Sequence, residues 1–164
     1  METMVSSDPS KGTIYDPVRK RWVACSPEER VRQSLLIHML NSLSYPKELL
    51  SIEKALHEMP HLSTVSSLPE RRVDILCYGK GIHPEHQLYP LLMIECKECS
   101  TMQGQAKEQV IGYNHFVKAY FLAIAYPGKV ECGYFDVKKN VYTFFDHLPP
   151  FPKLISALHH AKNH

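Results

Sequence analysis

Apolar residues recur along the chain with spacings that are typical of helices in some segments and of strands in others. The clearest helical period covers residues 27–43, where apolar side chains return every three or four positions. Ser26 suits the N-cap, Pro27 suits the first helical position and Glu29 completes a capping box. Tyr45-Pro46 follows, and the residue before a proline disfavours helical backbone. We therefore predict an amphipathic helix over residues 27–43.

Several short apolar segments predict strands instead. Residues 72–78 are rich in strand-forming side chains, and residues 91–97 form an apolar run of the kind that is buried on both faces of a sheet. Between them, Gly79-Lys80-Gly81 is typical of a turn and residues 82–90 of a loop. Residues 49–56 fit either a strand or a helix. The remaining predictions are a helix over 103–118, a strand over 120–126, a hairpin of 130–137 with 141–145 and a short terminal helix that begins near Phe151.

The order of these elements predicts an α/β fold in which helices flank a mixed central sheet. The chain has 164 residues, of which 44% are hydrophobic and 22% charged, and this suits one globular domain with a single core. Residues 1–14 are polar, and we expect them to form a flexible N-terminal tail. The expected organisation is a tail over 1–14 and a single domain over 15–164.

Charge and cysteine content bear on partners and location. The formal net charge of +2 does not by itself indicate nucleic acid, for which a dedicated domain is usually far more basic. Three basic clusters, Arg19-Lys20-Arg21, Arg71-Arg72 and Lys138-Lys139, either contact a phosphate backbone or form solvated surface. The five cysteines are typical of reduced thiols, and the sequence has neither an apolar run of roughly 18 residues nor the apolar core of a signal peptide. We expect a cytoplasmic protein without membrane contact.

Charged side chains inside the apolar segments are the first candidates for chemistry. Glu95 and Lys97 belong to the apolar run over 91–97, and residues two apart in a strand point to the same face. Asp74 lies within the preceding apolar segment. A buried charge is costly unless it is paired or binds a metal, so these three groups are expected to have such partners.

Pairing of the two strands would bring the three charged groups together. Two carboxylates on a rigid sheet suit Mg²⁺, which binds substrate phosphates beside a few carboxylate ligands. A neighbouring lysine can orient a metal-bound water or help to deprotonate it, so Asp74, Glu95 and Lys97 together suit the cutting of a phosphodiester bond. The competing interpretation is a structural salt bridge of either acid with Lys97 or Arg72.

A zinc-peptidase pattern also occurs. His57-Glu58-Met59-Pro60-His61 spells H-E-x-x-H, which binds zinc only when a continuous helix places both histidines on one face. Pro60 opposes helical backbone at this point, because it removes a donor and restricts the residue before it. The sequence therefore does not favour this interpretation.

A series of ordered motifs carries a family resemblance over about residues 15–152. The motifs are Tyr15-Asp16-Pro17-Val18-Arg19-Lys20-Arg21-Trp22-Val23, Pro27-Glu28-Glu29-Arg30-Val31-Arg32-Gln33, Tyr45-Pro46, Arg72-Val73-Asp74-Ile75, Ile94-Glu95-Cys96-Lys97, Gln109-x-x-x-Tyr113-Asn114 and Leu148-Pro149-Pro150-Phe151-Pro152. With these motifs the chain resembles the N-terminal nuclease domain of type I restriction enzyme R subunits. The resemblance implies a PD-(D/E)XK fold with a restriction-endonuclease-like core. It also implies an endonuclease that uses Mg²⁺, or alternatively Mn²⁺, to hydrolyse phosphodiester bonds of DNA.

The resemblance assigns roles to particular residues. Asp74, Glu95 and Lys97 would form the catalytic core. Gln109 and Tyr113 would form a Q-x-x-x-Y element beside it, and their spacing of four places both on one helix face.

The resemblance also implies a metal site formed by Asp74, Glu95 and Cys96, with Glu29 of the first helix near the metal. Two of these residues have a second interpretation. The capping box already accounts for Glu29. The Cys96 thiol is expected to pack as a small hydrophobic group, and its C-x-x-C spacing with Cys99 lacks the second pair that a tetrahedral site needs.

The chain departs from the family pattern at two places. Val73 precedes Asp74 where the superfamily name has proline, and Glu98-Cys99-Ser100 stands where a small residue and a proline are expected. The alternative to an enzyme is a non-catalytic nucleic-acid-binding or regulatory module on the same fold. RNA is the alternative substrate to DNA, and a homodimer is a further expectation, because nucleases that cut both strands often work as pairs. Sequence and strand preference do not follow from the sequence.

Overall fold

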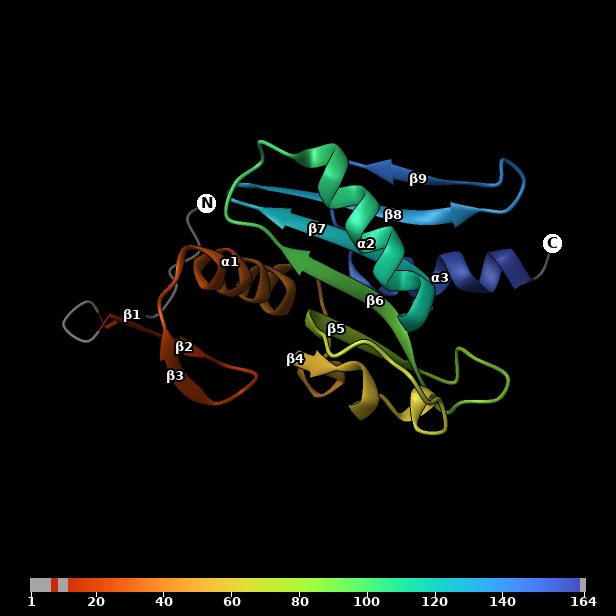
Figure 1. Ribbon diagram of the computed structural model, residues 1–164, viewed down its shortest axis with the longest axis horizontal. Coiled ribbons are helices and arrows are strands. Elements are labelled where there is room, and N and C mark those ends of the chain that lie inside the picture. The colour runs from red at the N-terminus through yellow and green to blue at the C-terminus, as the bar shows by residue number, and fades with distance from the viewer. Residues whose placement is uncertain (1–6, 9–11, 163–164) are drawn as a thin grey trace.

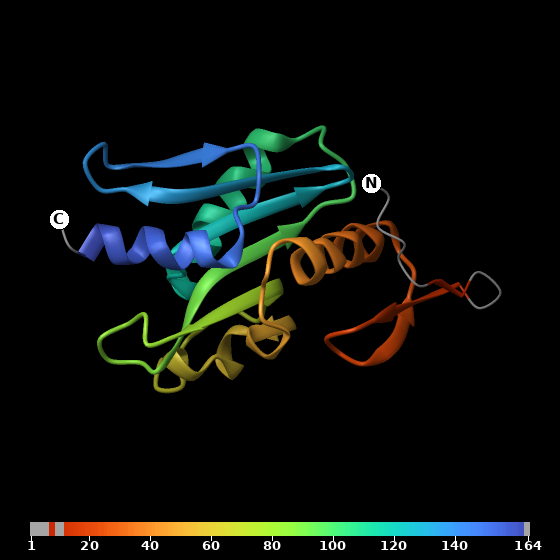
Figure 2. The same ribbon diagram turned by 180° about the vertical axis from the view of Figure 1, so that it is seen from behind.

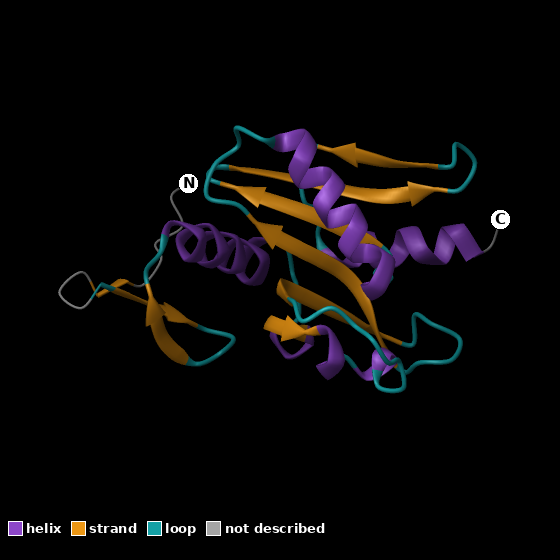
Figure 3. Cartoon of the chain, viewed as in Figure 1, coloured by secondary structure: helices purple, strands orange, loops and turns teal. Residues whose placement is uncertain are grey.

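The computed structural model describes residues 7–8 and 12–162, which form helices on both faces of a central sheet and a small second sheet at one end (Figures 1 and 3). The helices are α1 (Pro27–Ser42), α2 (Gln103–Val117) and α3 (Phe151–Lys162), with 3-10 turns η1 (Lys47–Leu49), η2 (Leu56–Glu58) and η3 (Pro60–Leu62). The strands are β1 (Ser7–Asp8), β2 (Thr13–Asp16), β3 (Arg21–Ala24), β4 (Leu50–Ala55), β5 (Arg72–Lys80), β6 (Leu88–Cys96), β7 (Phe121–Tyr126), β8 (Lys129–Asp136) and β9 (Val141–Phe145).

The central sheet has six strands in the order β4-β5-β6-β7-β8-β9. Neighbouring strands are antiparallel except β6 and β7, whose parallel pairing needs a crossover that α2 supplies. Helix α2 covers one face of the sheet, and α1 and α3 lie on the other (Figures 1 and 2). The predicted α/β class with a mixed sheet flanked by helices is confirmed.

Helix α1 begins where its capping residues predict. The Ser26 side chain accepts a hydrogen bond from the main-chain N–H of Glu29 at 3.1 Å, and Pro27 is the first helical residue. Leu36 and Met39 are fully buried on the face that packs on the sheet. Nearer the start of the same helix, Glu29 and Arg32 are also buried. The buried face of the helix is therefore apolar in its later turns and charged in its first turns.

Part of the expected N-terminal tail belongs to ordered strands. Thr13 and Ile14 lie in β2, which pairs with β1 on one side and β3 on the other, and Ile14 is only 2% exposed. The tail prediction is therefore wrong for residues 7–8 and 12–14, and the rest of 1–14 lies outside the described residues. Strands this short and polar carry no apolar period, so their pairing is visible only in the folded chain.

Other boundaries differ by a few residues. Gly79 and Lys80, predicted to form a turn, extend β5, and β6 begins at Leu88 within the predicted loop. The ambiguous segment over 49–56 resolves as strand β4, because its backbone pairs with β5. In the described part of the chain no helix has the length and apolarity needed to cross a membrane.

Candidate active site

Three acidic residues lie opposite one another on β4, β5 and β6. The register of the flanking pairs places Glu53 opposite Asp74 and Asp74 opposite Glu95. Opposed residues of antiparallel strands share a face, with their Cβ atoms about 4.5–5.5 Å apart. Glu53 breaks the alternation, because its backbone is left-handed with φ of 51°. Asp74 and Glu95 thus form an opposed pair, and the Glu53 carboxylate on the neighbouring strand lies 3.4 Å from Arg32, which also contacts Asp74.

The Glu95 carboxyl group lies in surroundings that disfavour its charge. Burial raises the pKa of Glu95 to about 8, and the nearby negative charge of Asp74 adds to this effect, whereas Lys97 and Arg71 oppose it. Its Oε1 atom is buried and has no hydrogen-bond partner among the described residues. A buried carboxylate oxygen without a partner is the kind of group that a bound cation would satisfy.

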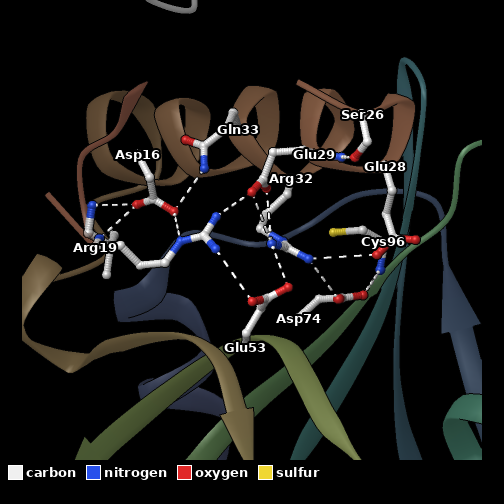
Figure 4. A network of polar contacts seen from close by, with 11 residues as sticks. Asp16, Arg19, Ser26, Glu28, Glu29, Arg32, Gln33, Glu53, Asp74 and Cys96 are labelled. Carbon is white, nitrogen blue, oxygen red and sulfur yellow. Dashed lines mark hydrogen bonds and ion pairs between the residues drawn. The ribbon is translucent and has the colours of Figure 1, made fainter. Parts of the chain in front are cut away.

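Asp74 is held in place by two hydrogen bonds (Figure 4). Its Oδ2 atom accepts from the main-chain N–H of Cys96 at 2.7 Å, and its Oδ1 atom accepts from Nη2 of Arg32 at 3.0 Å. The side chain is 13% exposed. A carboxylate has about four acceptor positions, so both oxygens keep lone pairs beyond these two contacts.

Lys97 follows directly after β6 and faces α2. Its Nζ atom donates a hydrogen bond to Oε1 of Gln109 at 3.1 Å, while its main-chain N–H donates to the carbonyl oxygen of Ala125 at 2.8 Å. The buried ring of Tyr113 lies 3.8 Å below the guanidinium of Arg71, whose charge also acts on Glu95. The structure thus brings Gln109 into contact with Lys97, and Tyr113 reaches the site through Arg71.

Cys96 contributes its main chain to the site. Its thiol is buried, and burial raises the pKa of Cys96 well above the ordinary value, so the sulfur stays protonated at neutral pH. Its N–H orients Asp74, as described above. A role of Cys96 as a metal ligand would therefore have to use its carbonyl oxygen, which is a suitable hard ligand for Mg²⁺.

Glu29 lies in a network of arginines and carboxylates next to the acidic pair (Figure 4). Its carboxylate pairs with Arg19 and with Nη1 of Arg32, the latter at 3.0 Å. Arg32 also lies 3.4 Å from a carboxylate oxygen of Glu53 and 3.6 Å from one of Glu28. The connection between Glu29 and Asp74 therefore runs through Arg32.

Glu28 and Arg32 belong to the site, although the sequence analysis placed them in a family motif without giving either a role. Burial, followed by the charge of Asp74, raises the pKa of Glu28, while Arg32 and Lys97 oppose this shift. Arg32 is only 4% exposed and reaches across to Asp74, 42 residues further along the chain. The sequence did carry one signal for Arg32: a charged residue stands at a helix position where the apolar stripe predicts a buried side chain.

A cavity of about 610 Å³ borders this network. It lies between the β2–β3 hairpin, the start of α1 and β4. The residues that line it are Arg19, Arg21, Trp22, Val23, Ala24, Ser26, Pro27, Glu28, Glu29, Arg32, Glu53 and Glu98. A second cavity, of about 260 Å³, has Lys97 and Gln109 in its wall. The first cavity thus borders Glu28 and Arg32, and the second borders Lys97, which are groups that act on the acidic pair.

Across the described residues, no three His, Cys, Asp or Glu side chains are grouped as a ready-made metal site. The H-E-x-x-H segment is divided between η2 and η3, so it is not a continuous helix. His57 is largely exposed, and Nε2 of His61 is 2.7 Å from the carbonyl oxygen of Val117. The expectation that this motif does not form a zinc site is consistent with this geometry.

The mixed sheet, its helical crossover and the acidic pair beside a lysine define an α/β protein with an endonuclease-like core. The model of the family described as the type I restriction enzyme R protein N terminus matches residues 27–149. The chain therefore belongs to this family, as its motifs indicated. Comparison with curated proteins and comparison with solved structures found no match.

Proposed function

We propose that this protein is a Mg²⁺-dependent endonuclease that hydrolyses phosphodiester bonds of DNA, with Mn²⁺ as an alternative metal. The observation that carries the proposal is the pair of Asp74 and Glu95, which lie opposite each other on adjacent strands with Lys97 beside them. Membership of a restriction-enzyme family supports a nuclease domain and DNA as its substrate. A cytoplasmic location and a homodimer remain predictions.

The residues present fit a divalent metal ion. Glu95 offers a buried oxygen without a partner in the described chain, and Asp74 offers lone pairs on two oriented oxygens. Asp74 and Glu95 would hold the ion, with the Cys96 carbonyl oxygen as a further ligand. When bound, the metal would polarise the phosphate and lower the pKa of a coordinated water.

Lys97 would act on the attacking water or on the scissile phosphate. Gln109 accepts one N–H of its ammonium group, which fixes the direction of the side chain and leaves other donors for the substrate. The ammonium also lowers the cost of the negative charge on Glu95. Glu28, half-exposed and within the field of Asp74, is placed to orient water at the edge of the same site.

The direct test is cleavage of DNA by the purified protein with Mg²⁺ or Mn²⁺. Lys97→Ala should abolish cutting, because it removes the charge beside the acidic pair, whereas Lys47→Ala, at an exposed position in η1, should cut like the wild type. Removing a positioned general acid or base typically costs about 10²–10⁴-fold in rate. Equal cutting by Lys97→Ala would assign the activity to another site or to a contaminant.

The ion pair between Arg32 and Asp74 favours a second candidate function, a nucleic-acid-binding or regulatory module without catalysis. Arg32 supplies Asp74 with a positive partner at 3.0 Å without any metal. Binding of DNA without metal-dependent cutting, together with no uptake of Mg²⁺ or Mn²⁺ at millimolar concentration, would support this candidate over the enzyme.

A further inference from the structure

Trp22, the single tryptophan of the chain, lies on β3 beside the acidic site. It is 51% exposed and lines the 610 Å³ cavity together with Glu28, Arg32 and Glu53. An isolated exposed apolar side chain is ordinary on a protein surface and carries no meaning alone. Trp22 differs because Arg32, in the wall of the same cavity, also donates to Asp74. The indole thus borders the cavity whose wall includes Arg32, the residue that contacts the proposed metal ligand Asp74.

The hairpin that carries Trp22 is fixed to α1 by buried charges (Figure 4). Asp16 is fully buried and accepts hydrogen bonds from the main-chain N–H groups of Val18 and Arg19, both at 2.8 Å. It also accepts from the Arg19 guanidinium and from the Gln33 amide on α1, the latter at 2.9 Å. Arg19 continues to Glu29. Because these groups give up solvation, the network favours one placement of the hairpin against the helix.

Trp22 combines an oriented ring with basic neighbours on its own hairpin, while Glu28, Glu29, Glu53 and Glu98 contribute the acidic part of the same cavity wall. Tyr15 lies opposite Trp22 in the β2–β3 register, and the two rings meet edge to face with centroids 5.5 Å apart. This contact limits rotation of the indole. The two preceding residues, Lys20 and Arg21, are exposed. A flat aromatic surface next to basic side chains is the combination that binds single-stranded nucleic acid.

We propose that Trp22 stacks on an unpaired base of the DNA strand whose phosphates approach Asp74 and Glu95. The proposal rests on the proposed function for the choice of DNA as ligand. Lys20 and Arg21 would contact the phosphates next to the stacked base, and every base offers a π-face, so the contact tolerates many sequences. A base within an intact duplex has both faces covered by its neighbours, so this surface selects single-stranded or frayed DNA.

Because Trp22 is the only tryptophan, its fluorescence reports the contact directly. The metal-free 164-residue chain, in EDTA, is titrated with a single-stranded oligodeoxynucleotide, with its duplex and with an abasic strand of equal length and charge. The single strand should quench the fluorescence strongly, and the abasic strand and the duplex should quench it weakly. Equal quenching by the abasic strand would overturn the proposal, because phosphate charge alone would then explain the signal.

Variants measure how much the ring contributes to affinity. Trp22→Ala should weaken binding of a dye-labelled single strand by on the order of 10-fold or more, as expected for one base–aromatic contact, while Trp22→Phe should retain most of it. Phe135→Ala is the matched control. Phe135 is also an exposed aromatic residue, but it lines a different cavity, whose wall includes residues of α3. Trp22→Ala with wild-type affinity and an unchanged circular dichroism spectrum would contradict the stacking role.

Failure of this proposal can be distinguished from failure of the proposed function. Metal-dependent cutting by a protein whose Trp22 does not respond to single-stranded DNA would remove the stacking role and leave the nuclease standing. Quenching that depends on bases, without cutting in Mg²⁺ or Mn²⁺, would support the stacking surface and reject the enzyme.

Discussion

At the scale of single residues, the site combines groups whose charges oppose and offset one another. Asp74 and Glu95 repel each other, and burial adds to the cost of ionising Glu95. The positive charges of Lys97 and Arg71 reduce the cost of ionising Glu95, while Arg32 offsets the charge of Asp74 through a direct contact. A divalent cation between the acids would reduce it further, and this links stability to metal binding.

Replacing Glu95 should stabilise the metal-free protein at alkaline pH. The pKa of Glu95 is raised from 4.5 to about 8, so the folded state keeps a proton that the unfolded chain releases, and stability falls as pH rises between these values. Glu95→Gln removes this loss. At pH 8 the gain should be a few kcal/mol, since one pKa unit corresponds to about 1.4 kcal/mol, and it should vanish below the pKa of the unfolded chain.

Urea unfolding in EDTA at several pH values measures the effect of Glu95→Gln. Glu48→Gln, at an exposed position in η1, is the control and should leave stability unchanged. Equal destabilisation by Glu95→Gln at acid and alkaline pH would show that folding does not raise the pKa of Glu95.

The sequence identified Asp74, Glu95 and Lys97 because charges inside apolar segments violate the ordinary pattern of a core strand. It did not identify Arg32 as the partner of Asp74, since a contact between α1 and β5 exists only after folding. The predicted capping box forms only in part, because the Ser26 side chain accepts from the main-chain N–H of Glu29 while the Ser26 N–H donates to Ala24 and the Glu29 carboxylate pairs with arginines instead.

At the scale of elements, the hairpin of β2 and β3 is the part that the apolar pattern missed. Its strands have four residues each and mix polar with aromatic side chains, so neither alternation nor an apolar run is visible. Its placement depends on the side chain of Asp16, which joins the hairpin to α1. By contrast, α1 and α2 were predictable, because their periods extend over several turns.

Asp16→Asn should therefore loosen the hairpin without unfolding the central sheet. Although burial opposes ionisation, hydrogen bonds from Arg19, Gln33 and Val18 lower the pKa of Asp16, so its contribution to stability is present above pH 3.8 and lost as pH falls through the lowered pKa. Loss of such charge-assisted bonds should cost about 1–3 kcal/mol at neutral pH.

Hydrogen exchange of the β2 and β3 amides, compared with that of α2, reports this local effect. The matched control is Asp136→Asn, because Asp136 also accepts two main-chain N–H groups in a turn but lies at the end of β8 and is more exposed than Asp16. Similar loss of protection in both variants, or loss throughout the sheet, would contradict the anchoring role of Asp16.

At the scale of the whole molecule, the topology explains why the candidate residues meet. The antiparallel pairing of β5 and β6 sets Asp74 against Glu95, and the crossover from β6 through α2 to β7 returns Gln109 to Lys97. The order of elements along the chain predicted this sheet. The hairpin of β2 and β3, which forms one wall of the 610 Å³ cavity, was not predictable in this way, because buried ion pairs and no periodic pattern hold it in place.

Titration calorimetry with Mn²⁺ tests the central claim, that Asp74 and Glu95 bind one divalent ion between them. The wild type should bind one equivalent, and Asp74→Asn and Glu95→Gln should each lose it, whereas the exposed control Glu48→Gln should bind like the wild type. No uptake by the wild type at millimolar Mn²⁺, or unchanged uptake by both site variants, would contradict a shared metal at these two carboxylates.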